Sequence, residues 1–380
     1  ATDAVRQARE LVVAQQQAAP LAEGAGPEQG ASLLRYGQGR LAMSLVEQGG
    51  FDNLALLSTG LLSFDGNVRL NLANALSLYA GAYGLAESAA ADSRVELSSH
   101  YLRLAGARPA ASVGPSETKT AIDMGTSVRP ATGQWRLSGR GLLDVRDKVN
   151  LGARGSIRLL QGREQVVDRR AFAQVQLDSL GDLRLLASPS SIANAMSLTL
   201  PGDLRITAAQ VYPGTGVKAL VQATRIDIGR PVGAIPAQPL SAFGELKLQA
   251  DVINQGGVLR APLGSLEVGY GGNSPRPASR VNLLPGSLTS VSGAGLVIPY
   301  GGTVDGKTWL YDGVALSTTL LKAAQNNMPG KVDLIGQTID VAEGAVVDVS
   351  GGGVVLGAGF VAGRGGSTDA RFNPLVQYGP

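Results

Sequence analysis

The sequence contains no cysteine and only one histidine, His100, among its 380 residues. The lack of cysteine excludes disulfide bonds, thiolate metal sites and cysteine nucleophiles. With a single histidine, neither a histidine-based metal centre nor a histidine-dependent catalytic triad is expected. We interpret His100 as a structural or surface residue, and we predict no catalytic, metal-binding or cofactor-binding residue.

Aromatic and charged residues are also scarce, at 4% and 17%, and the formal net charge is only +3. The lysines and arginines are scattered, so no electrostatic argument favours nucleic acid as a partner. No apolar run reaches the ~20 residues of a membrane helix, so no membrane-spanning segment is expected. The sequence starts at Ala1 without a methionine or a signal peptide. We therefore expect an internal fragment or a processed product of a longer protein.

Glycine and aliphatic residues are abundant, with 52 glycines and 44% hydrophobic residues, which argues against disorder. A five-residue phrase recurs: glycine, polar, aliphatic, polar, aliphatic. Its clearest copies are residues 244–248 (GELKL) and 264–268 (GSLEV). This alternation predicts a strand with one buried face, opened by a turn residue. Further versions begin at Gly66, Ser93, Gly133, Gly155, Gly181, Gly202, Thr224 and Gly330.

The copies recur mostly at spacings near twenty-one residues or its multiples, with two more short strands between the copies at 244 and 264. Three short strands per repeat favour a chain coiled on itself, because each aliphatic face must be buried against its neighbours. If consecutive copies stack, their fourth residues form a column of alternating charge: Arg205, Asp227, Lys247 and Glu267. We predict an all-β fold, a right-handed parallel β-helix (solenoid) with a short N-terminal helix and loop insertions.

The regions outside the repeat define the expected organisation. Residues 1–19 have apolar residues at helical spacing, and proline- or glycine-rich stretches interrupt the repeat elsewhere. A short helix is expected at 317–325. The predicted regions are an N-terminal helix and linker (1–30), a shaft (31–284) with an insertion near 107–130, a non-repeating insert (285–328), the last circuits (329–350) and a glycine-rich tail (351–380).

Four stretches, residues 49–70, 244–269, 281–311 and 339–369, resemble the filamentous haemagglutinin-like large exoproteins of two-partner secretion. The resemblance implies a long β-helical fibre that is exported through an outer-membrane transporter partner. It also implies an extracellular or outer-surface location on a Gram-negative bacterium. No catalytic residue pattern comes with this family.

We therefore expect a segment of a secreted surface adhesin or fibrous exoprotein, with a host receptor, a glycan or neighbouring exoprotein molecules as partners. End-to-end stacking would make it a homo-oligomer. Tyr300, Trp309 and Tyr311 lie in or beside the expected insert and are candidate glycan or partner contacts. Two alternatives stay open: the stalk of a contact-dependent inhibition toxin-delivery exoprotein, and a β-helical polysaccharide-degrading enzyme. The enzyme would use the candidate residues Asp227, Glu245, Lys247 and Glu267.

Overall fold

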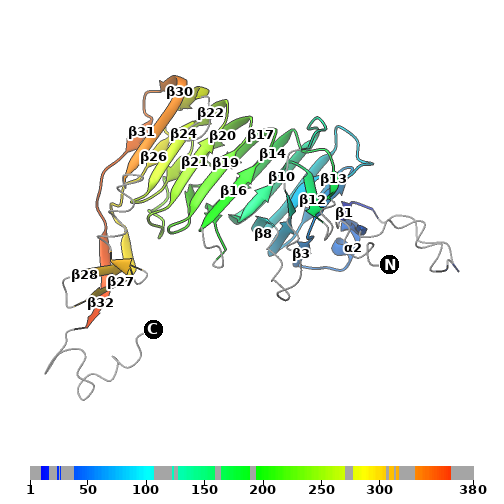
Figure 1. Cartoon of the computed structure of the whole chain (residues 1–380), viewed down its shortest axis with the longest axis horizontal. Helices are drawn as coiled ribbons and strands as arrows, with labels where there is room; N and C mark the ends of the chain where they lie inside the picture. Colours follow the sequence, from blue (N-terminus) through cyan, green and yellow to red (C-terminus); the bar gives the residue numbers. More distant parts are fainter. Residues whose placement is uncertain are drawn as a thin grey trace, which may run out of the picture.

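The computed structural model is almost entirely β, as the sequence predicted, and a large parallel sheet dominates it. Its strands lie side by side across the long axis of the molecule (Figure 1). The structure describes residues 10–16, 24, 26, 38–106, 122–123, 127–158, 164–188, 194–269, 277–304, 308–311, 314–315 and 330–360.

The parallel strands form three runs of hydrogen-bonded neighbours, which we call ladders 1, 2 and 3. In ladder 1 the pairing stays in register from Val68 to Ile339, so that apolar residues follow one another along a single column. Its strands are β5 (Val68–Asn71), the first half of β8 (Arg94–Gly106), the first half of β10 (Gln134–Arg146), β14 (Gln174–Ser179), β17 (Asp203–Thr207), β20 (Arg225–Gly229), β22 (Val252–Gln255), β25 (Ala278–Leu283) and the second half of β30 (Lys331–Val341).

Ladders 2 and 3 are built in the same way. Ladder 2 contains β3 (Asn53–Leu57), β6 (Ala75–Ala80), the second halves of β8 and β10, β15 (Leu183–Leu186), β18 (Val211–Pro213), β23 (Val258–Arg260), β26 (Leu288–Ser290) and β31 (Val346–Asp348). Ladder 3 contains β11 (Lys148–Asn150), β16 (Ala195–Thr199), β19 (Lys218–Gln222), β21 (Glu245–Gln249), β24 (Ser265–Gly269) and the first half of β30. From β14 to β19 the chain visits ladders 1, 2 and 3 in turn, and we call one such passage a circuit.

The core lies between the ladders. Along β17, Leu204 and Ile206 are each 1% exposed, while the residues between and beside them are not buried. Alternating strands of this kind place every second side chain on the inner face. The inner residues of all three ladders join one hydrophobic cluster that extends from Val12 to Val291.

The repeat length predicted from the sequence was too uniform. Ladder 1 partners are 29 residues apart between 174 and 203, 22 between 203 and 225, and 27 between 225 and 252. The copies at 202 and 224 both lie in ladder 1, but those at 244 and 264 lie in ladder 3. The expected column of four alternating charges is therefore wrong. It is two separate pairs, Arg205 beside Asp227 in ladder 1 and Lys247 beside Glu267 in ladder 3.

The N-terminal helix predicted within residues 1–30 is wrong for the part that the structure describes. Glu10–Ala14 is a strand, β1, and the sheet order is β2-β1-β4-β7, with β2 at Gln38–Ala42, β4 at Leu61–Asp65 and β7 at Ala82–Leu85. Helical spacing did not decide the conformation, because β1 has a parallel partner on both edges. The short helix that does occur, α2 (Met43–Gln48), buries Met43 and Val46 and contacts β5.

A buried ion pair fixes β1 to a distant part of the chain. Arg169 donates from Nε and Nη2 to the Glu10 carboxylate at 3.0 and 2.9 Å, and Ser63 and Gln38 donate to the same group at 2.6 and 2.9 Å. Burial alone would raise the pKa of Glu10, but these hydrogen bonds and the Arg169 charge outweigh it and lower the pKa.

Two smaller sheets stand apart from the ladders. The predicted copy at Gly155 belongs to an antiparallel sheet of β9 (Ile122–Asp123), β12 (Arg154–Arg158) and β13 (Glu164–Asp168), so it is not a ladder strand. The second sheet has the order β29-β28-β27-β32, with β27 at Val297–Val304, β28 at Thr308–Tyr311, β29 at Val314–Ala315 and β32 at Val354–Phe360.

The expected insert and the expected tail both contain described strands. β26 lies within the expected 285–328 insert, yet it pairs with β23 and β31 in ladder 2. The expected tail of 351–380 begins with β32. Most of the 107–130 insertion, the helix expected at 317–325 and residues 361–380 lie outside the described residues.

Candidate functional site

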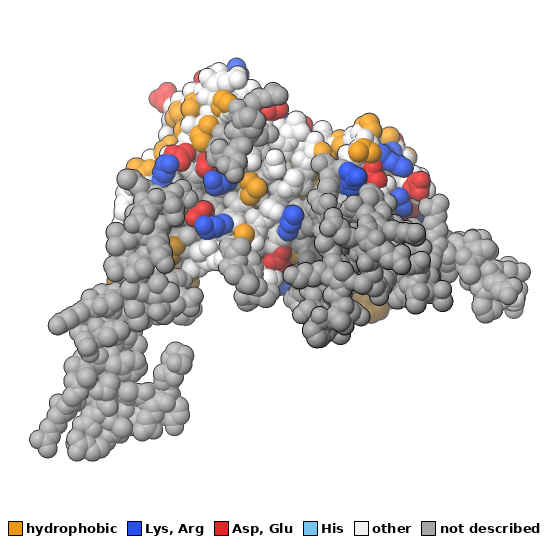
Figure 2. All heavy atoms as spheres, viewed as in Figure 1, with side chains coloured by type: hydrophobic (Ala, Val, Ile, Leu, Met, Phe, Trp, Pro, Cys, Tyr) orange, Lys and Arg blue, Asp and Glu red, His pale blue; other side chains and the backbone are white. Residues whose placement is uncertain are grey.

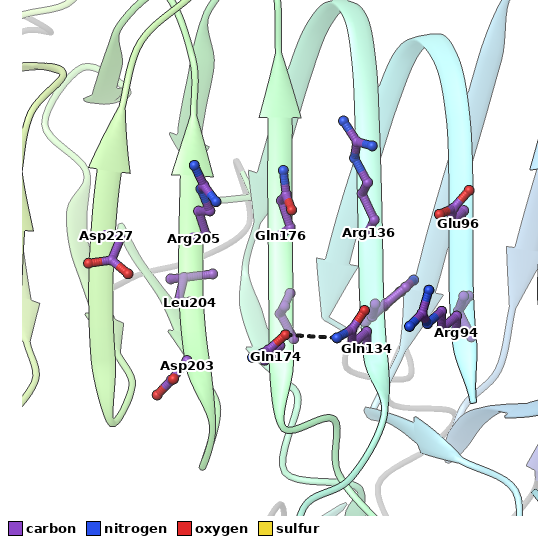
Figure 3. Close-up of a pocket in the computed structure, with 13 residues that line it drawn as sticks. Arg94, Glu96, Gln134, Arg136, Gln174, Gln176, Asp203, Leu204, Arg205 and Asp227 are labelled. Carbon is purple, nitrogen blue, oxygen red and sulfur yellow. Dashed lines mark hydrogen bonds between the residues drawn. The ribbon is translucent and has the colours of Figure 1, made fainter. Parts of the chain in front are cut away.

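The outer face of ladder 1 carries two rows of polar side chains that cross the strands (Figure 3). One row contains Glu96, Arg136, Gln176, Arg205 and Asp227, one from each successive strand. The rows exist because in-register pairing places equivalent outward positions next to each other. The second row contains Arg94, Gln134, Gln174 and Asp203.

The side chains of both rows line a hollow of about 370 Å³ on the surface. Gln134 Nε2 donates to Gln174 Oε1 at 3.0 Å, which links two neighbouring strands across the hollow. Arg136 Nε donates to Asp178 Oδ2 at 2.7 Å. Its other guanidinium nitrogens make no further bond to the described residues.

A hydrogen-bonded chain continues this face toward the C-terminal strands. Asn282 donates to Asn254 at 2.6 Å, Asn254 donates to Asp227 at 2.5 Å, and Arg225 pairs with the same carboxylate at 2.9 Å. Partial burial acts to raise the pKa of Asp227, but the bonds from Arg225 and Asn254 lower it overall. Asp227 is thus an ionised carboxylate at neutral pH, and it is bonded to Arg225 and Asn254 on the same face.

Two of the three arginines that line the hollow make no side-chain bond to the described residues. Arg94 and Arg205 are both exposed, and neither side chain has a hydrogen-bond or ion-pair partner among the described residues. Both line the same hollow, together with the amides of Gln134, Gln174 and Gln176. The hollow therefore combines two exposed guanidinium groups with amides and with the carboxylates of Glu96, Asp203 and Asp227. The charge of Arg205 helps to lower the pKa of the neighbouring Asp227.

Ladder 2 carries a different polar cluster whose groups are mutually satisfied. The Asp144 carboxylate, 1% exposed, accepts bonds from Arg184 Nε and Nη2 at 2.7 and 2.9 Å and from the Tyr101 hydroxyl at 2.7 Å. Burial raises the pKa of Tyr101, and the bond to Asp144 raises it further, so Tyr101 is a donor and not a base. Arg103 bonds both Tyr101 and Tyr79. We interpret this cluster as a stabilising network.

The carboxylates and lysine considered for catalysis do not form one cluster. Asp227 lies on ladder 1, whereas Glu245, Lys247 and Glu267 lie on ladder 3. Lys247 Nζ pairs with Glu267 at 3.0 Å, and Lys218 Nζ lies 3.6 Å from Glu245. Asp227 is thus separated from the other three candidates, which lie on the paired strands β21 and β24.

The aromatic residues predicted as contacts lie in the second small sheet. Tyr300 is in β27, and Trp309 and Tyr311 are in β28, where Trp309 is opposite Thr303 and Tyr311 opposite Gly301. Their role stays a prediction. From the sequence, Arg205 and Asp227 were named as members of the expected charge column, but Arg94, Arg136 and the glutamines of ladder 1 were not singled out. Arg136 and Arg205 occupy the fourth position of copies of the repeated phrase, and the correct circuit would have aligned them.

Other kinds of site find little support in the described part of the chain. No group of three acidic or histidine side chains there is placed to hold a metal ion. No described helix combines the length and apolar character needed to cross a bilayer. Positive and negative side chains are interspersed over the visible described surface (Figure 2).

Fold and surface together define an all-β protein built on a large parallel sheet, with a polar, hydrogen-bonding outer face. No known protein-family model, curated protein or solved structure matches the chain.

Proposed function

We propose that the chain is a right-handed parallel β-helical shaft, a segment of a secreted bacterial surface adhesin or fibrous exoprotein. The observation that carries this proposal is the single inward column from Val68 to Ile339, maintained through every strand of ladder 1. Three such ladders around one core form an elongated body with long outer faces. A body of this kind acts by extending away from a cell and presenting its surface.

The resemblance to two-partner secretion exoproteins supports the same function from the sequence. A transporter partner in the outer membrane would export the chain, and the ladders would form outside the cell. The ion pairs and amide chains on the outer faces support a structural role, because they hold neighbouring strands in register.

Small-angle X-ray scattering tests the shaft. A compact chain of 380 residues has a radius of gyration of about 21 Å. We expect a clearly larger value, together with a linear cross-section region typical of a rod. A scattering curve without that region would contradict the shaft, whatever the overall radius.

Bead retention tests adhesion. Beads coated with the full chain are passed under flow over cultured epithelial cells and over a bare surface. The matched control carries Leu204→Asp, which places a charge in the buried column and should disrupt the fold by several kcal/mol. We expect retention of the native chain only. Equal retention of native and control beads would contradict an adhesive role.

A further inference from the structure

The geometry points to a ligand for the outer face of ladder 1: an extended polysaccharide that carries carboxylate groups, no more than one per sugar, and no sulfate groups. This inference rests on the proposed adhesive function, because it names the class of molecule that the shaft would hold. The residues that carry it are Arg94 and Arg205, with the glutamine amides that lie between them in the same hollow.

The two arginines are placed for an elongated ligand. Arg94 is on β8 and Arg205 on β17, with β10 and β14 between them. Adjacent strands lie ~4.8 Å apart, so the two positions are separated by roughly 14 Å along the long axis. One ligand that contacts both must run along that axis, across the strands.

The chemistry of the hollow favours a hydroxyl-rich acidic chain. A guanidinium binds a carboxylate through two parallel N–H···O bonds. The amide nitrogens of Gln134 and Gln176 already donate to Gln174 and Asp178, which leaves their amide oxygens and the Gln174 nitrogen to pair with hydroxyl groups. The Glu96, Asp203 and Asp227 carboxylates of the same hollow can accept from hydroxyl groups. These carboxylates also repel a ligand of high charge density, such as a sulfated polysaccharide or a nucleic acid, which would require a mainly cationic surface.

Arginine and other polar side chains also line two further hollows on this face. One neighbouring hollow of about 510 Å³ is lined by Arg69, Ser138 and Arg140, among others. Another is lined by Arg225, Asn254, Arg280 and Asn282. Of these arginines, Arg140 and Arg225 already bond Asn71 and Asp227. Arg69 and Arg280 are exposed, make no side-chain bond to the described residues and are therefore further contacts for a polymer on this face.

Calorimetric titration of the full chain with polygalacturonate oligomers tests the inference, with heparin and dextran as comparison ligands. We expect binding of polygalacturonate, weaker binding of heparin and none of dextran. The Arg94→Ala/Arg205→Ala variant should lose about tenfold or more in affinity, because it removes both guanidinium donors to the ligand carboxylates. Arg94→Lys/Arg205→Lys should fall between the two, since lysine keeps the charge but not the planar fork.

The matched control is Lys148→Ala/Lys218→Ala, which removes two exposed cations from ladder 3 and should leave the affinity unchanged. Unchanged melting of the arginine variants shows that they are folded. The inference is overturned if the native chain does not bind polygalacturonate, if heparin binds more tightly, or if both double-alanine variants lose affinity equally. Bead retention without polygalacturonate binding would remove this inference and leave the adhesive shaft standing.

Discussion

Several glycines that open the repeated phrase occupy corners where consecutive circuits come too close for a side chain. A Cβ atom on Gly264 would overlap the carbonyl oxygen of Gly244, and one on Gly181 would overlap that of Gly141. Neither Gly264 nor Gly181 is among the residues with positive φ. The repeated phrase predicted turn residues at these glycines. At Gly264 and Gly181, however, glycine is required because the neighbouring strand leaves no space for a side chain.

Replacement of Gly264 by alanine should destabilise the chain by at least ~1–3 kcal/mol, because backbone atoms must move to admit the methyl group. Gly229→Ala is the matched control, since a Cβ there meets no atom within 4 Å. It should be neutral or stabilise by about 0.4–1 kcal/mol through the unfolded chain. Thermal denaturation measures both, and equal effects would refute the close-approach explanation.

The Glu10–Arg169 pair makes part of the stability dependent on pH. Because the folded-state pKa of Glu10 lies below its ordinary value of 4.5, the stabilising contribution of its carboxylate is fully present above pH 4.5. It is lost as the pH falls through the lower, folded-state pKa. Glu10→Gln should cost about 3 kcal/mol at pH 7, since Arg169 keeps its charge in a site only 12% exposed.

Urea denaturation at neutral pH and at about pH 3 measures this effect. The difference between Glu10→Gln and the native chain should shrink in acid, because the contribution of the carboxylate declines as the pH falls below its ordinary pKa and through the lowered one. Glu47→Gln on the exposed side of α2 should behave like the native chain at both pH values. A Glu10→Gln penalty that is the same at both would show that charge is not the cause.

At the scale of elements, the strand register can be tested through charge pairs. Lys247 and Glu267 are neighbours in ladder 3, whereas Asp227 and Lys247, adjacent in the column expected from sequence, lie on different ladders. A double-mutant cycle on Lys247 and Glu267 should give a coupling of roughly 0.2–1 kcal/mol. The cycle on Asp227 and Lys247 should be additive within about 0.5 kcal/mol. The reverse result would favour the sequence-based column.

The sequence was sufficient to predict the all-β class and the inward residues, because alternation in segments such as DLRIT determines which side chains are buried. It was insufficient for the circuits, since strands of ladders 1 and 3 have the same alternation and only their pairing separates them. β12 has the alternation of a ladder strand, but its antiparallel partner β13 removes it from the stack. β1 is a strand because it has two partners, and no local pattern reveals them. The polar rows of ladder 1 were not assembled from the sequence for the same reason as the circuits.

At the scale of the whole molecule, the two ends of the ladders differ. At the N-terminal end, α2 contacts β5, and Val68 and Leu70 remain 2% and 1% exposed. At the other end, Ile339 and Val341 continue inward columns but are 41% and 55% exposed. The last circuit lacks a covering layer among the described residues.

Hydrogen exchange should therefore be uneven along the molecule. Amides of β30 and β31 should exchange faster than those of β17 and β20, which have a partner strand on each side. Mass spectrometry of peptic fragments measures the difference. Uniform protection along the full chain would indicate that another layer covers the last circuit.

The ion pair between Glu10 and Arg169 also affects the order in which segments of the chain can become stably attached. A chain that emerges from its amino terminus exposes Glu10 first, but the arginine that neutralises it follows 159 residues later. Until Arg169 arrives, β1 would bury a charged carboxylate without its cation, which is unfavourable. β1 is thus secured only after the strands that lie between it and Arg169 have emerged. A chain interrupted before Arg169 would keep its first segment loosely attached.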